Sequence, residues 1–330
     1  MDLSFIKKEN FIQQHTETGF NELALQVFHF QAEANPVYRD YLQYAGKKPQ
    51  EIRTVSEIPF LPVEFFKSHK VISSKEKADL MFSSSSTTGM QPSKHYVVDP
   101  GWYESSFMSG FKLFYGNPEE MCVLALLPSY LEREGSSLIY MMNHLIRESK
   151  HPFSGFYLHN TDELIEKLRE LEEKKQKTLL MGVSFALLDL AEQYQLQLQH
   201  TIVMETGGMK GQRKEITRGA LHGFLCKRLG VSEIHSEYGM TELLSQAYSG
   251  GHGRYRTPPW MRILIRDLYD PFSLVEKNRT GGVNIIDLAN VWSCAFIETK
   301  DLGLLHQDGS FEISGRFDHS DTRGCNLLVV

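Results

Sequence analysis

Short apolar runs alternate with helix-like segments through the middle of the chain, and this alternation limits the possible folds more than any other feature. The runs at 121–127, 178–181 and 201–204 have the length of buried strands. Between the first two runs, leucines recur with the spacing of one helical face. Further strand-like runs follow at 261–265, 282–286, 295–298 and 311–314. This order predicts an α/β fold with helix-flanked β-sheets and a β-rich lobe.

Helices are predicted at four places. The stretch up to about Tyr44 has helical spacing, and Pro36 interrupts it. Thr161 and Asp162 can cap a second helix. The other two helices are predicted over 184–194 and 214–229. The segment 58–66 contains two prolines and is predicted to be an irregular loop.

The composition excludes a general affinity for polyanions. Charged residues make up 23% of the 330 residues and the formal net charge is -6, so the chain has no general electrostatic attraction to nucleic acid or to an anionic membrane. Residues 1–10 lack the apolar core of a signal peptide, and no apolar run approaches the roughly 20 residues that span a bilayer. We therefore expect a cytoplasmic protein with no nucleic-acid partner and no membrane span.

The cysteines are widely separated and form no C-x-x-C pair, so we expect neither a zinc knuckle nor a disulfide framework. Cys122, Cys226 and Cys294 lie in apolar strand or helix patterns, and we expect them to be inert core residues. Cys325 lies near the C-terminal end of the sequence.

A run of small hydroxyl residues gives the first chemical signal. Hydroxyl groups and backbone amides beside a glycine can bind phosphate, and Lys94 adds positive charge. The order does not match the P-loop G-x-x-x-x-G-K-[ST], and a strand-like segment follows where a P-loop has a helix. Taken alone, the run could also be a plain polar turn. The candidate ATP-binding residues in it are Ser84, Ser85, Ser86, Thr87, Thr88 and Gly89.

A second signal is the sequence Tyr-Gly-Met-Thr-Glu at 238–242. Tyr238 can stack on a nucleobase, and Gly239 allows a tight turn. The Thr241 hydroxyl can reach a phosphate, and Glu242 can hold Mg²⁺, which prefers hard oxygen ligands. Taken alone, these residues could also begin a helix with Thr241 as its cap.

Together the two segments resemble the adenylate-forming superfamily of acyl-CoA synthetases, firefly-type luciferases and peptide-synthetase adenylation domains. The phosphate loop of that superfamily is similar to T-S-G-T-T-G-x-P-K. Its later motif Y-G-x-T-E matches Tyr238 to Glu242, with Met240 in the variable position. The resemblance implies the fold of the large N-terminal domain of these enzymes.

Three further motifs follow in the order of the superfamily. The resemblance implies that Gly207 and Gly208 lie along the adenine and that Asp301 holds the ribose hydroxyls. It also implies that Arg316, in a G-R-x-D sequence, contacts the nucleotide. The matching motifs extend over about 80–325, which is most of the chain.

The chain departs from the superfamily pattern at Ser86 and Lys300, which replace glycines. The resemblance predicts three parts: a helical segment at 1–75 packed on the main domain, an adenylation core at 76–315, and a hinge and tail at 316–330. We expect most of the small C-terminal domain of these enzymes to be absent.

Within the superfamily, the chain most resembles the acyl-protein synthetases of the bacterial luminescence fatty-acid reductase system. Residues 127–133, Leu-Pro-Ser-Tyr-Leu-Glu-Arg, and Cys325 carry this likeness. Members of that family convert a fatty acid to acyl-AMP, move the acyl group to their own cysteine and pass it to a reductase. The resemblance implies that Cys325 is the cysteine that carries the acyl group.

The predicted chemistry places a carboxylic acid and MgATP between the loop at 84–89 and the turn at 238–242. The catalytic residues would be Cys325, Lys94 and Glu242, with ATP and Mg²⁺ as cofactors and Glu242 as the metal ligand. The acyl carrier step would require a partner: an acyl reductase, an acyltransferase or an acyl carrier protein.

Two alternatives stay open. The protein could give its acyl group to CoA or to a carrier protein, like the phenylacetate-CoA ligases, or it could be a non-catalytic homologue that binds nucleotide or acyl ligand. Lys94, Lys210 and His95 are candidates to replace the catalytic lysine of the small domain. The acyl pocket is expected near 182–185 and 127–138.

Overall fold

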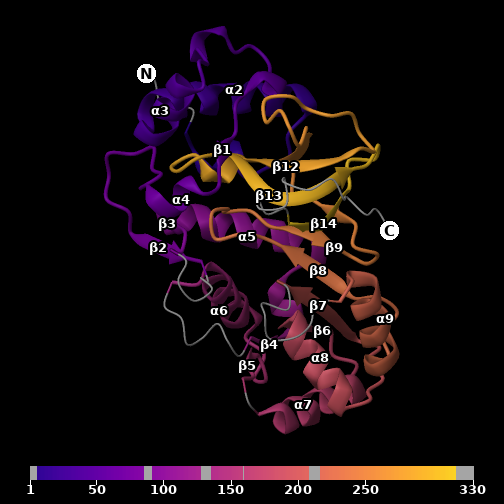
Figure 1. The fold of residues 1–330 in the computed structure, drawn as a ribbon. Coiled ribbons are helices and arrows are strands. Elements are labelled where there is room, and N and C mark those ends of the chain that lie inside the picture. The colour runs from indigo at the N-terminus through magenta and orange to yellow at the C-terminus, as the bar shows by residue number, and fades with distance from the viewer. Residues whose placement is uncertain (1–5, 85–90, 128–134, 159, 208–215, 317–330) are drawn as a thin grey trace.

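The first half of the main sheet is parallel, and helices pack around it (Figure 1). The computed structural model describes residues 6–84, 91–127, 135–158, 160–207 and 216–316. In spatial order the parallel strands are β5 (Gly155–Phe156), β4 (Cys122–Leu126), β6 (Thr178–Val183), β7 (Thr201–Thr206) and β8 (His235–Tyr238). Every residue of β4 and β6 is buried, because helices cover the sheet. The helices of this half are α5 (Pro100–Tyr115), α6 (Ser137–Ser149), α7 (Thr161–Glu173), α8 (Ser184–Gln193) and α9 (Arg218–Leu229).

The second half of the sheet is antiparallel. It continues from β8 through β9 (Ala247–Ser249), β10 (Tyr255–Arg256), β14 (Phe311–Arg316), β13 (Phe296–Leu305), β12 (Thr280–Asp287) and β11 (Met261–Arg266), and β1 (Leu61–Pro62) pairs with β13. Strand β8 is parallel to β7 and antiparallel to β9, so it forms the seam between the two halves. Along β13, buried residues alternate with half-buried ones, as expected where one face is covered.

A separate hairpin lies beside the sheet. Its strands are β2 (Leu80–Ser83) and β3 (Lys94–Val97), and they pair antiparallel from Leu80 opposite Val97 to Ser83 opposite Lys94. The hydroxyl-rich run therefore connects the two strands of a hairpin, as the strand-like segments on either side of it predicted.

The N-terminal helices pack on the antiparallel half (Figure 1). They are α1 (Lys8–Phe11), α2 (Glu17–Ala34), α3 (Pro36–Tyr44) and α4 (Phe65–Ser68). The same segment contains the 3₁₀ turns η1 (Pro49–Glu51) and η2 (Val55–Glu57). Two further 3₁₀ turns, η3 (Pro118–Glu120) and η4 (Leu288–Asn290), lie later in the chain. Phe28 meets Phe296 edge-to-face at 6.1 Å. Gln31, fully buried, donates to the carbonyl oxygens of Asn290 and Val291 and accepts from the Ala295 amide. Within the described parts of the chain, no helix is both long and apolar enough to cross a bilayer.

Most of the elements predicted from periodicity are confirmed, and some details are wrong. The predicted helix over 214–229 begins only at Arg218, where the Thr217 hydroxyl accepts from the Ala220 amide. The helix at 161 begins after Asn160 and has no side-chain cap. The segment 58–66 is not irregular throughout, because it contains β1, which ends at Pro62, and the start of α4 at Phe65. Helices α5 and α6 and strand β8 were not predicted, because their polar residues mask the apolar period.

The prediction of inert cysteines is confirmed for two of the three. Cys122 and Cys294 are fully buried, and burial raises the pKa of the first thiol to about 11 and that of the second to about 12. Cys226 is half-buried on α9 and packs against the edge of the core, so it is not the fully buried core residue that was expected.

A buried carboxylate, Asp287, joins the end of β12 to the chain that follows residue 242. It accepts from the amides of Leu244, Ser245 and Ala289, and from the Ser245 hydroxyl at 2.5 Å. The same hydroxyl accepts from the indole N–H of Trp260 at 3.1 Å. Asp287 is fully buried, and burial raises the pKa of its carboxyl. The network fixes the segment behind the candidate site.

We expect Asp287→Ala to lower the free energy of unfolding by at least about 3 kcal/mol, because it leaves several buried donors without an acceptor. Urea unfolding measures the change. Asp270→Ala is the matched control, since Asp270 also accepts from a backbone amide and a hydroxyl but is exposed. Its expected loss is below about 1 kcal/mol. Equal losses in the two variants would contradict a structural role for Asp287.

Candidate active site

The carboxyl ends of β7 and β8 bring two predicted motifs side by side. In the parallel register, Thr206 lies opposite Glu237, so Gly207, which follows β7, is close to the start of the turn after β8. Ligands of α/β sheets bind at this edge, where loops leave the carboxyl ends of the strands. Gly207 has φ +68°, in the left-handed region that favours glycine. Its carbonyl oxygen accepts from the Ser184 hydroxyl at 2.9 Å.

Asp301 brings the third predicted motif to the same place. Its Oδ2 accepts from the Tyr238 hydroxyl at 2.6 Å, and its Oδ1 accepts from Arg316 Nε at 2.8 Å. Asp301 lies opposite Arg316 in the β13–β14 pair, which explains their contact. Burial and the Asp301 carboxylate hold the pKa of Tyr238 well above its usual value, so its hydroxyl stays protonated and donates. Tyr238, Asp301 and Arg316, which are separated in sequence, are therefore joined by hydrogen bonds to one carboxylate.

His95 joins the hydroxyl-rich hairpin to the turn at 238–242. The ring is fully buried, and Nδ1 donates to the Thr241 carbonyl oxygen at 2.8 Å. Nε2 lies 3.1 Å from the side-chain oxygen of Asn290, whose amide donates to the Glu242 carbonyl oxygen at 2.8 Å. Burial lowers the pKa of His95 to about 4, so the ring is neutral near pH 7. His95 therefore holds the backbone of the turn.

Glu242 lies beside the base of the hydroxyl-rich loop. Its carboxyl is buried and hydrogen-bonds with Ser93, and burial raises its pKa. Ser93 in turn donates its amide to the Ser84 hydroxyl at 2.8 Å, while the Ser84 amide donates to the Ser93 carbonyl oxygen at 3.0 Å. The two ends of the loop are thus closed against each other, next to Glu242.

Lys94 is half-buried on β3, opposite Ser83. Side chains alternate between the two faces of a strand, so Lys94 points away from the face on which Ser93 and His95 meet the turn. Gly239 and Met240 lie in the turn itself, and Gly239 is exposed.

The donor chemistry at Glu242 fits a magnesium ion bound to a nucleotide. Mg²⁺ in nucleotide sites takes one or two carboxylates, and the phosphates and water complete its ligands. Within the described residues there is no group of three or more metal-ligating side chains. A cation bound here through the phosphates would favour the charged form of Glu242, against the effect of burial.

Eight predicted site residues lie outside the described residues. They are Ser85, Ser86, Thr87, Thr88, Gly89, Gly208, Lys210 and Cys325.

Sequence reasoning missed Asn290 and did not identify the structural role of His95 in holding the turn. Asn290 lies in a 3₁₀ turn that follows an apolar strand, and no motif marks it. His95 was proposed as a substitute for a catalytic lysine, whereas the structure buries the ring and commits its Nδ1–H to the Thr241 carbonyl oxygen.

Comparisons with known proteins give a likeness of fold. No protein-family model matches the sequence, and a sequence search of curated proteins found no match. Among solved structures, the chain is similar to an open conformation of 2-hydroxyisobutyryl-CoA ligase in complex with 2-HIB-AMP and CoA. The TM-score is 0.65 at 14% identity, covering 92% of this chain and 70% of that one. The fold is that of the large N-terminal domain of adenylate-forming enzymes.

A second similar structure is ATP-bound MatB from Rhodopseudomonas palustris, with a TM-score of 0.54 at 17% identity. That match covers 73% of this chain and 49% of MatB, so it spans about half of the length of MatB.

We expect His95 to make stability depend on pH. The ring is neutral in the fold, where its pKa is about 4, and has the ordinary value of 6.5 when unfolded. The unfolded chain therefore binds more protons between these values, and stability falls as the pH drops from 7 through 6.5 toward 4. Urea unfolding should show about 2 kcal/mol less stability at pH 4.5 than at pH 7 from this group alone.

The His95→Gln variant isolates this contribution, because the other titrating groups are the same in both proteins. We expect the variant to be less stable at pH 7 and to lose less stability than the wild type on acidification. Parallel stability curves for the two proteins would show that His95 is not neutral in the fold.

Proposed function

We propose that the protein uses ATP to convert a carboxylic acid into an acyl-adenylate. The meeting of Tyr238, Asp301 and Arg316 beside the Glu242 turn carries the proposal. The fold supports it, since one similar structure holds an acyl-AMP and another holds ATP. An ATP-dependent step also agrees with the cytoplasmic location expected from the sequence.

In the proposed first step, a carboxylate oxygen of the substrate attacks the α-phosphorus of ATP. The bond from this phosphorus to the bridging oxygen breaks, and pyrophosphate leaves. The protein contributes orientation and charge neutralisation, with little covalent work. Asp301 accepts from the ribose hydroxyls, Arg316 contacts the nucleotide, and Glu242 holds the magnesium ion.

The hydroxyl-rich loop binds phosphate in this scheme. Its residues 84–89 supply hydroxyl and backbone donors, and Lys94 adds charge near them. Gly207 and Gly208 lie along the adenine, and the turn Tyr238-Gly239-Met240-Thr241 covers the nucleotide on the other side.

In the proposed second step, the Cys325 thiolate attacks the acyl carbonyl carbon, and AMP leaves with the bonding electrons of the acyl–phosphate bond. A thiolate is a strong nucleophile and an acyl-adenylate has a good leaving group. The resulting thioester then passes to a partner: an acyl reductase, an acyltransferase or an acyl carrier protein.

A second candidate acceptor is a thiol in solution, such as that of CoA. The similarity to a CoA ligase bound to both 2-HIB-AMP and CoA favours this alternative. The first step is the same in both schemes.

We expect Asp301→Asn to raise the KM for ATP at least about tenfold in acid-dependent ATP–pyrophosphate exchange. Losing charge-assisted hydrogen bonds to the ribose costs about 1.5–3 kcal/mol, which corresponds to that change. Asp308→Asn is the control, because Asp308 is an exposed carboxylate on the β13–β14 loop. Equal KM values in the two variants would show that Asp301 does not bind the nucleotide. Absence of exchange by the wild type over a broad panel of acids would favour a non-catalytic homologue.

Intact-mass analysis after incubation with ATP and an acid substrate tests the carrier residue. We expect the mass of one acyl group on the wild type, none on Cys325→Ser, and retention on the control Cys226→Ser. An adduct that persists in Cys325→Ser would assign the thioester to another residue. Turnover that needs added CoA and no protein adduct would favour the CoA alternative.

A further inference from the structure

Three polar side chains lie on one face of neighbouring strands at the candidate site, and a fourth lies close to them. In the β7–β8 register Thr206 is opposite Glu237, and in the β8–β9 register Glu237 is opposite Tyr248. Gln246 lies just before β9, and its Cγ and Glu237 Oε1 are both close to Gly239. We call these residues, Thr206, Glu237, Gln246 and Tyr248, the polar cluster.

The polar cluster is packed against Gly239, the second residue of the Tyr238–Glu242 turn. Thr206 Oγ1 donates to Glu237 Oε2 at 2.5 Å. A Cβ added at Gly239 would lie 2.4 Å from Glu237 Oε1 and 3.4 Å from Gln246 Cγ. The cluster therefore directly adjoins the turn that the proposed function assigns to the nucleotide.

Two buried atoms of the polar cluster have no hydrogen-bond partner among the residues that the structure describes. The Tyr248 hydroxyl and Gln246 Oε1 are both unpartnered, on residues only 3% and 5% exposed. Such atoms are rare in folded proteins, because a buried polar group without a partner destabilises the fold. Burial and the nearby Glu237 carboxylate also hold the pKa of Tyr248 well above its usual value, so the hydroxyl is protonated.

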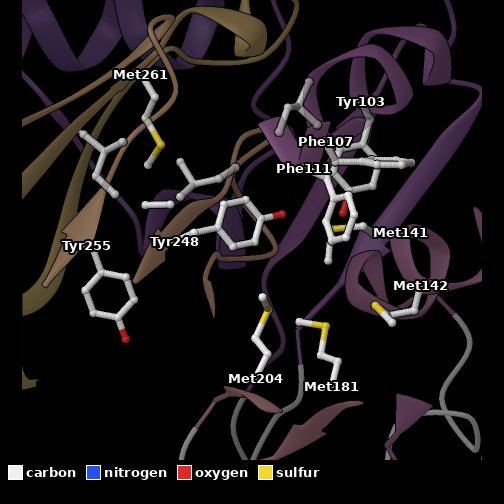
Figure 2. Close-up of a cluster of buried hydrophobic side chains, with 14 of the residues drawn as sticks. Tyr103, Phe107, Phe111, Met141, Met142, Met181, Met204, Tyr248, Tyr255 and Met261 are labelled. Carbon is white, nitrogen blue, oxygen red and sulfur yellow. The ribbon is translucent and has the colours of Figure 1, made fainter. Parts of the chain in front are cut away.

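The surroundings of the polar cluster are apolar. Figure 2 shows the Tyr248 hydroxyl directed toward the aromatic side chains of Phe107 and Phe111, with Met181 and Met204 on one side. These four residues are all buried. A few convergent polar atoms in an apolar, aromatic setting are typical of small-molecule sites.

We propose that the polar cluster binds a hydroxyl or ammonium group carried by the carboxylic acid substrate. This inference rests on the proposed function, which it narrows from carboxylic acids in general to acids with a hydrogen-bond donor. It replaces the unsubstituted fatty acid that the sequence resemblance implied.

The acceptors in the cluster account for this choice of ligand. Glu237 and Gln246 Oε1 accept hydrogen bonds, and the Tyr248 oxygen can also accept. An unsubstituted alkyl chain would cover these atoms and supply no donor, so they would stay buried without a partner, which costs affinity. A site built to bind a hydroxyl or amino group discriminates strongly against the analogue that lacks it.

The test compares hexanoate with its singly hydroxylated and singly aminated derivatives. Isothermal titration measures binding, and ATP–pyrophosphate exchange measures activation. We expect at least one derivative to exceed hexanoate about tenfold or more in both. Comparison of the hydroxylated with the aminated acids then identifies the donor.

Tyr248→Phe should reduce the preference for the derivative about tenfold. It should also raise the Tm by about 2 °C, because it removes a buried hydroxyl without a partner. Gln246→Met is a second variant that should reduce the preference in the same way. Tyr38→Phe is the matched control, since its buried hydroxyl donates to the Pro59 carbonyl oxygen in the N-terminal segment. It should keep the preference and lower the Tm.

Each outcome has one meaning for this inference. Equal binding of all the acids, tighter binding of hexanoate, or an unchanged preference in both Tyr248→Phe and Gln246→Met would overturn it. Preferential binding of a derivative without any pyrophosphate exchange would support the polar cluster as a binding site and overturn the proposed function.

Discussion

The turn from Tyr238 to Glu242 depends on hydrogen bonds that distant segments give to its main chain. A buried carbonyl oxygen without a donor costs about 1–3 kcal/mol. His95, 146 residues from Thr241, and Asn290, 48 residues from Glu242, supply the donors. Because one lies in the hairpin and the other in η4, the turn takes this form only when both parts of the fold have docked. The candidate site is therefore a product of tertiary assembly.

The seam strand β8 presents polar side chains to both halves of the sheet. Neighbouring residues of a strand point to opposite faces. Tyr238 reaches Asp301 in the antiparallel half, while Glu237 accepts from Thr206 in the parallel half. In the proposed reaction, the first of these faces meets the nucleotide and the second meets the acid, so the bond that forms between them lies at the edge of the sheet.

The fold was largely predictable, because buried parallel strands such as β4 and β6 are continuous apolar runs. The motif residues Tyr238, Asp301 and Arg316 were also found from sequence, and the structure brings them together. Asn290 and the polar cluster could not be found in this way. Their importance comes from register and burial, which place Thr206, Glu237 and Tyr248 together although each looks ordinary in its own segment.

Gln31 connects the N-terminal helices to the candidate site. It donates to the carbonyl oxygens of Asn290 and Val291, directly behind the amide that supports Glu242. A chain shortened by its first two helices would keep every motif residue, yet the hydrogen bonds behind the Tyr238–Glu242 turn would be lost. A minimal fragment that keeps the candidate site intact therefore has to begin upstream of α2.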